Sequence, residues 1–88
     1  MIIRYAAKAR RDLDRFEQSV AERIVKKMAW FAEREDPLGF AEPLSVPGRH
    51  LYRFEISDYR AICTIEHGTV TILLVLAVRN RKDAYWDL

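Results

Sequence analysis

A run of strict alternation from Leu51 to Ile56 most constrains the fold of this chain. Successive side chains of a β-strand point to opposite faces, so this period predicts a half-buried strand. Tyr52, Phe54 and Ile56 occupy one face, and Leu51, Arg53 and Glu55 occupy the other. The alternation therefore predicts that Arg53 and Glu55 lie side by side on the face away from the core.

Two further strands are expected after this run. Ser57-Asp58 predicts a turn into a strand over 59–66, and His67-Gly68 predicts a tight hairpin into a strand from Val70 to Val78. The last run is apolar on both faces, which is typical of a central strand. The second half of the chain thus predicts a three-stranded antiparallel meander.

The first half predicts a short strand and two helices. Ile2–Tyr5 has β-type residues, and 7–16 has one apolar side typical of a surface helix. Ser19 followed by Glu22 matches a capping box, which predicts the start of the second helix. That helix ends before Asp36-Pro37, because proline disfavours helical geometry in the residue before it.

The remaining stretch, 37–49, contains all three prolines and two of the three glycines. These residues predict a loop without a helix or strand. A chain of 88 residues forms one domain, so residues 1–88 are expected to be a single unit. The elements together predict an α+β fold in which a helical hairpin packs on one face of a four-stranded sheet.

Charge points weakly towards an anionic ligand. The net charge is only +2, from 15 basic and 13 acidic residues. From Arg49 onward, however, the basic residues are arginines except for Lys82. The planar guanidinium suits phosphate, which favours nucleic acid, although a solvated basic surface is the alternative.

Several classes of protein are not expected. The single Cys63 excludes an internal disulfide and fits a reducing cytosol. His50 and His67 are too few to predict a metal site, and no cofactor motif is present. No signal peptide and no membrane-spanning segment are expected, so we predict a cytoplasmic protein without metal, cofactor or membrane partner.

Three stretches, taken in order, resemble the RelE/ParE superfamily of bacterial and archaeal toxins, and specifically its RelE branch. They are Pro43–Gly48, Leu51–Arg60 with its closing Tyr-Arg pair, and Val78–Tyr85, in which Arg81 precedes Tyr85 by four residues. The resemblance covers nearly the whole chain and implies a RelE/ParE-like fold.

The resemblance also implies an activity and a set of partners. Such a toxin enters the ribosomal A site and cleaves the messenger RNA there, with the ribose 2′-hydroxyl as nucleophile. A cognate antitoxin neutralises it, and operator DNA is bound only through the toxin–antitoxin complex.

That chemistry needs a base, positive charge at the phosphorus and an acid for the leaving oxygen. Arg53, Arg60 and Arg81 are the predicted phosphate ligands, and the last two occupy positions of the family's phosphate-binding arginines. Glu55 stands where the best-known RelE pattern has a basic residue. It is either the general base or an acid that only orients Arg53. Alternatively, these arginines are surface residues paired with acids such as Glu55 and Asp83.

The end of the chain supplies the remaining candidates. Tyr85 is predicted to stack on the messenger base, as aromatic side chains do with single-stranded RNA, or else to anchor the tail together with Trp86. Arg79 and Lys82 are further predicted RNA contacts. The general acid stays unassigned between an arginine-stabilised leaving group and Lys82.

Two alternative functions remain on the same fold. A ParE-type toxin inhibits DNA gyrase without cleaving RNA, and a decayed homologue only binds antitoxin and operator DNA. Retention of Arg60, Arg81 and Tyr85 favours the nuclease. Glu55 and the pair Arg79-Asn80 depart from the family pattern and keep the decayed homologue open.

Overall fold

The computed structural model describes residues 1–83. Its helices are α1 (Ala7–Asp14), α2 (Gln18–Ala32) and the short 3₁₀ helix η1 (Pro37–Phe40). Its strands are β1 (Ile2–Tyr5), β2 (Glu42–Val46), β3 (Arg49–Ile56), β4 (Tyr59–Glu66) and β5 (Ile72–Asn80).

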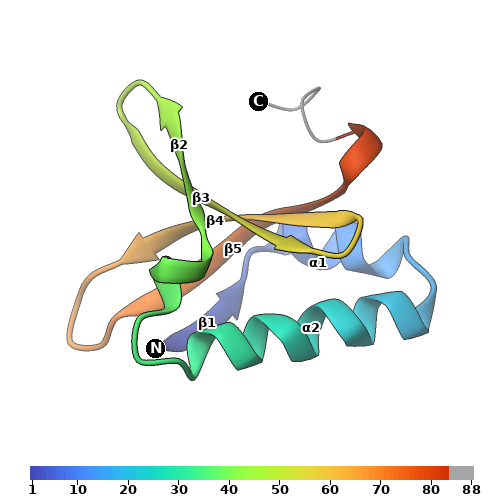
Figure 1. The fold of residues 1–88 in the computed structure, drawn as a ribbon, viewed down its shortest axis with the longest axis horizontal. Coiled ribbons are helices and arrows are strands. Elements are labelled where there is room, and N and C mark those ends of the chain that lie inside the picture. The colour runs from blue at the N-terminus through green and yellow to red at the C-terminus, as the bar shows by residue number, and fades with distance from the viewer. Residues whose placement is uncertain (84–88) are drawn as a thin grey trace.

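The five strands form one sheet in the order β1-β5-β4-β3-β2. β1 runs parallel to β5, and the other neighbouring strands are antiparallel. Both long helices lie on one face of this sheet (Figure 1). The α+β class, the meander and the central position of the last strand are therefore confirmed.

The sheet has five strands where four were expected, because the segment 37–49 is not a plain loop. It contains η1 and β2, and β2 pairs with β3 from Glu42↔Arg53 to Val46↔Arg49. Pro43 is tolerated because β2 is an edge strand, where a missing amide donor removes no ladder bond on the outer side. Gly48, with φ of 73°, then allows the tight turn into β3. Proline and glycine here mark an edge hairpin.

The predicted capping box is wrong. α2 begins at Gln18, its N-cap is Glu17, and no side chain caps its first turn. Ser19 lies inside that turn, while Glu22 accepts a hydrogen bond from the Gln18 side chain, Nε2 to Oε1, at 3.1 Å. Neither α1 nor α2 is long and apolar enough to cross a membrane.

The connection between β4 and β5 is longer than the predicted hairpin. Residues 67–71 form it, and Val70 is exposed instead of starting the strand. β5 begins at Ile72, where both neighbouring strands reach it: Ile2 of β1 and Glu66 of β4 pair with that residue. Pairing on two sides, more than local apolarity, thus sets this boundary.

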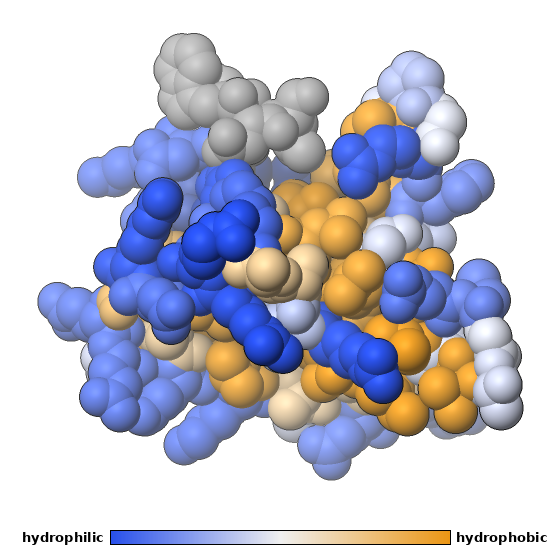
Figure 2. Space-filling view, turned by 180° about the vertical axis from the view of Figure 1, so that it is seen from behind, coloured by the Kyte–Doolittle hydropathy of each residue, from blue (hydrophilic) through white to orange (hydrophobic). Residues whose placement is uncertain are grey.

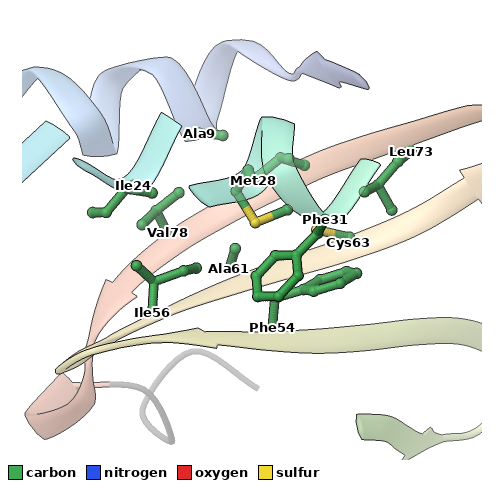
Figure 3. Close-up of a cluster of buried hydrophobic side chains, with 11 residues drawn as sticks. Ala9, Ile24, Met28, Phe31, Phe54, Ile56, Ala61, Cys63, Leu73 and Val78 are labelled. Carbon is green, nitrogen blue, oxygen red and sulfur yellow. The ribbon is translucent and has the colours of Figure 1, made fainter. Parts of the chain in front are cut away.

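The core lies between α2 and the sheet. Figure 3 shows Ile24, Met28 and Phe31 directed at the sheet, where Phe54 is fully buried. The rings of Phe31 and Phe54 are 5.0 Å apart. Burial raises the pKa of the Cys63 thiol to about 12, so this cysteine is an inert core residue. Because the helices cover only one face, the other face is available for a site.

Candidate functional site

The face of the sheet turned away from α1 and α2, here called the open face, carries the predicted polar residues. Phe54 and Ile56 are buried in the core, which places Arg53 and Glu55 on the open face as the alternation predicted. Arg60 of β4 lies opposite Glu55 in register. The Arg60 Nη2 and Glu55 Oε1 atoms are 3.4 Å apart, with the two side chains 23% and 59% exposed.

Arg53 has a partner that the sequence did not reveal. Its Nη2 donates to Oε2 of Glu42 at 2.6 Å, and its Nε is buried without a hydrogen-bond partner among the described residues. Glu42 is the first residue of β2 and lies opposite Arg53 in register. Glu42 was missed because β2 was not predicted. Without that strand, no pairing register places Glu42 opposite Arg53.

Arg79 lies opposite Arg60 on β5 but is held by helix α1. Its Nη1 is 2.8 Å from Oδ2 of Asp12, and the same oxygen accepts a hydrogen bond from the Val78 amide at 2.9 Å. The other oxygen of Asp12, Oδ1, is 2.8 Å from Lys8 Nζ. β1 has its last pair at Tyr5↔Val75, so the Val78 amide lies beyond its reach. At the edge of β5, Asp12 therefore supplies the hydrogen-bond acceptor that β1 does not provide for the Val78 amide.

Asp12 is ionised in this setting. Its side chain is only 4% exposed, and burial alone would raise its pKa. The hydrogen bonds from Lys8 and the Val78 amide, together with the charges of Arg79 and Lys8, outweigh that effect and hold the pKa below its ordinary value of 3.8. Arg79 is thus committed to a buried ion pair. Like charges directly opposite in a sheet repel, and separate acids for Arg60 and Arg79 relieve that repulsion.

Arg81 and Lys82 follow β5 in a single helical turn over 81–83 and are exposed. The Arg81 amide donates to the Asp58 carbonyl at 2.6 Å, which fixes this turn beside the β3–β4 hairpin. Glu55, Arg60 and Arg81 are therefore gathered at one end of the sheet. Tyr85 and Trp86 lie outside the described residues.

The surface seen from behind matches this arrangement. Figure 2 shows the β2–β3 hairpin projecting from the body of the protein, with apolar side chains visible in the hollow at its base. Leu51 and Ile62, beside Arg53 on β3 and β4, are buried. The site thus combines an apolar floor with arginine–carboxylate pairs.

This arrangement has a definite chemical capacity. A carboxylate can accept a proton from a hydroxyl group, and an adjacent guanidinium can bind the phosphate that the hydroxyl attacks. Within residues 1–83, no group of three or more His, Cys, Asp or Glu side chains gathers as a metal site.

Comparison with known proteins identifies the family. The family model of the ParE toxin of type II toxin–antitoxin systems (parDE) matches residues 3–85. The chain is a toxin of the RelE/ParE superfamily. No curated protein matches it.

Solved structures of toxin–antitoxin complexes share the fold. A chain of the RelBE2 complex from Mycobacterium tuberculosis is 24% identical, with a TM-score of 0.73 over 91% of this chain and 96% of that one. A chain of the archaeal RelE–RelB complex from Pyrococcus horikoshii OT3 is 19% identical, with a TM-score of 0.65 over 91% and 93%. A chain of the RelB–RelE complex from Methanococcus jannaschii is 19% identical, with a TM-score of 0.62 over 96% of each chain. At these identities the likeness establishes the fold.

Proposed function

We propose that this toxin is a ribosome-dependent endoribonuclease that cleaves messenger RNA in the A site. The observation that carries the proposal is the Glu55–Arg60 pair: an accessible carboxylate 3.4 Å from a guanidinium on the open face. Arg53 lies two residues from Glu55 on the same strand face, and Arg81 is fixed at the same end of the sheet. A base and several phosphate ligands are therefore close together.

The proposed reaction is a transfer within the RNA. Glu55 takes the proton of the ribose 2′-hydroxyl, the 2′-oxygen attacks the adjacent phosphorus, and the bond from phosphorus to the 5′-oxygen breaks. A cyclic phosphate forms, and the departing 5′-oxygen receives a proton. Arg60, Arg53 and Arg81 stabilise the charge that grows on the phosphorus oxygens. Either Lys82, which is exposed, donates this proton, or an arginine stabilises the leaving oxygen until it takes a proton from water.

The remaining predicted contacts divide into two kinds. Lys82 is exposed and stays a proposed RNA contact, and Tyr85 stays the proposed stacking residue. Arg79 differs, because its pairing with the buried Asp12 supports a structural role. We therefore propose that Arg79 stabilises the end of β5 from which Arg81 projects.

We also propose a cognate antitoxin as the toxin's partner in the cytoplasm, with operator DNA bound only through their complex. The solved structures that share this fold were determined as toxin–antitoxin complexes, which supports the antitoxin. Ribosome and messenger are proposed as further partners because the resemblance to the RelE branch implies them.

A ParE-type inhibitor of DNA gyrase is the second candidate. The match to the ParE toxin model over nearly the whole chain favours it. So does the pairing of Arg53, Arg60 and Arg79 with acids, which reduces the positive charge offered to RNA. In this candidate, the arginines of the open face contact protein.

Mapping messenger ends after induction of the toxin separates the candidates. Cuts within codons of translated messages are the result expected for the nuclease, and Arg81→Ala abolishes both these cuts and the growth arrest. Intact messages together with blocked supercoiling would support the gyrase inhibitor. Full toxicity of Arg81→Ala would show that the site is misplaced.

A further inference from the structure

Glu42 is a second acid at the candidate site, and its geometry is unusual. It belongs to the edge strand β2, is 64% exposed, and contacts an arginine that is only 19% exposed. The 2.6 Å contact joins one carboxylate oxygen to Nη2 of Arg53. Glu42 is thus a solvent-facing group laid over a largely covered guanidinium.

The contact uses only part of what Arg53 offers. The guanidinium presents its donors as a planar fork that matches two oxygens of one anion. Here Nη2 has an acceptor, while the neighbouring Nε is buried and lacks one among the described residues. A buried donor without an acceptor costs free energy. The pair with Glu42 is therefore weaker than a two-oxygen contact with the same guanidinium.

We infer that Glu42 is an exchangeable occupant of Arg53, which an RNA phosphate displaces when the toxin binds its substrate. The inference rests on the proposed function and assigns Glu42 as a residue that sets RNA affinity. An exposed carboxylate returns to water at small cost, and an exposed ion pair contributes little to stability. A phosphate can take the place of the Glu42 oxygen on Nη2, and a second oxygen can bind Nε once the Glu42 side chain has moved away. Glu42 therefore raises the RNA concentration needed to fill the site.

Removal of the Glu42 charge should increase RNA affinity, whereas loss of a purely structural contact would not. In Glu42→Gln, Arg53 is released from its competitor, so RNA binds more tightly than to the wild type. An exposed pair is worth up to about 1 kcal/mol, which corresponds to about a fivefold fall in Kd or KM.

Glu66→Gln is the matched control. It removes the same charge from the same sheet, but Glu66 is exposed at the end of β4 that pairs with Ile72, away from the β3–β4 turn. The probe is a short single-stranded RNA with 2′-O-methyl riboses, which cannot be cleaved, titrated against the full-length toxin. Cleavage of messenger on programmed ribosomes supplies kcat and KM.

The expected result is a lower Kd and a lower KM for Glu42→Gln, with Glu66→Gln equal to the wild type. Equal affinities for all three proteins, or weaker binding by Glu42→Gln, would overturn the inference. A fall in Kd for both variants alike would also overturn it, because net charge alone would then explain the gain.

A second measurement separates this inference from the proposed reaction. The Nε–Hε signal of Arg53, followed by NMR during a titration with inorganic phosphate, reports occupation of the guanidinium without any cleavage. Saturation at lower phosphate in Glu42→Gln than in wild type supports exchange, even if the toxin cuts no RNA. Identical titrations would reject exchange, even if the toxin proves to be a nuclease.

Discussion

Two arginine–carboxylate pairs of this toxin have similar lengths and opposite surroundings. Asp12 and Arg79 are 2.8 Å apart with exposures of 4% and 13%, and Glu42 and Arg53 are 2.6 Å apart with exposures of 64% and 19%. Contact distance does not separate them. Burial does: loss of one partner of the first pair removes a buried ionic contact, whereas water or a ligand can replace Glu42 in the second.

The comparison divides the arginines of the sheet by role. Arg79, although opposite Arg60 in register, is the arginine fixed by a buried acid. Arg60 and Arg53 are paired with exposed acids, and these are the arginines that we propose as phosphate ligands. One of these three arginines is therefore paired with a buried acid and two are paired with exposed acids.

Asp12→Ala tests the buried pair and has the largest expected effect on stability. It removes the buried contact with Arg79 and the acceptor of the Val78 amide, so the free energy of unfolding falls by about 3–5 kcal/mol. Urea unfolding measures this fall. Asp14→Ala is the control, because Asp14 is an exposed acid of the same helix. A difference below about 0.5 kcal/mol between the two variants would contradict the claim that the buried pair stabilises the fold more than an exposed acid does.

Arg60→Ala tests whether the exposed Glu55–Arg60 pair matters more for cleavage than for stability. Loss of one ligand to the transition state lowers the cleavage rate by about 10²–10³, while the loss of an exposed pair lowers stability by at most about 1 kcal/mol. Single-turnover cleavage on programmed ribosomes and urea unfolding provide the two readings. Arg79→Ala should behave oppositely, with a large loss of stability and a smaller loss of rate. The same response from both variants would show that burial does not divide the roles.

The pH dependence of stability tests whether the ionised form of Asp12 stabilises the fold. Its folded pKa is below the ordinary value of 3.8, so the ionised form stabilises the fold above that pH. This contribution disappears as the pH falls below about 4 and through the folded pKa. Urea unfolding at a series of acidic pH values should show the decline in wild type and a smaller decline in Asp12→Asn. Parallel curves would contradict the assignment.

The smallest predicted effect concerns the turn beside the Glu55–Arg60 pair. Ser57 has φ of 53°, a conformation that favours glycine. Ser57→Gly should raise the free energy of unfolding by about 0.5 kcal/mol, since relief of strain exceeds the entropy lost by glycine. Gly48→Ala, at φ of 73° in the β2–β3 turn, should lower it by about 1 kcal/mol. Chemical denaturation of both variants checks the opposite signs, and a loss in Ser57→Gly would be inconsistent with strain there.

The alternation of side chains and the turn residues in the second half of the chain predicted β3 and β4 correctly. The alternation over 51–56 placed Arg53 and Glu55 on one face, and the turn at Ser57-Asp58 gave the bounds of β4. The edge strand β2 was missed because Pro43 also suits a loop, and only pairing with β3 makes the segment a strand.

The site shows the same division between local and non-local information. The residues of the open face came from motif and alternation. Their partners did not: Glu42 is 11 positions from Arg53 in the chain, and Asp12 is 66 positions from the Val78 amide that it accepts from. No local pattern encodes such contacts. The single clue to Asp12 was an acid among the basic residues of α1, which is equally typical of a solvated helix face.

The most direct test of the central claim is Glu55→Gln. The variant keeps the size of the side chain and removes the carboxylate that is 3.4 Å from Arg60. Single-turnover cleavage of messenger on programmed ribosomes should fall by about 10²–10⁴, as expected when a general base is lost. The free energy of unfolding should change by less than about 1 kcal/mol. Cleavage by Glu55→Gln at the wild-type rate would contradict the claim that the exposed pair of the open face carries out the reaction.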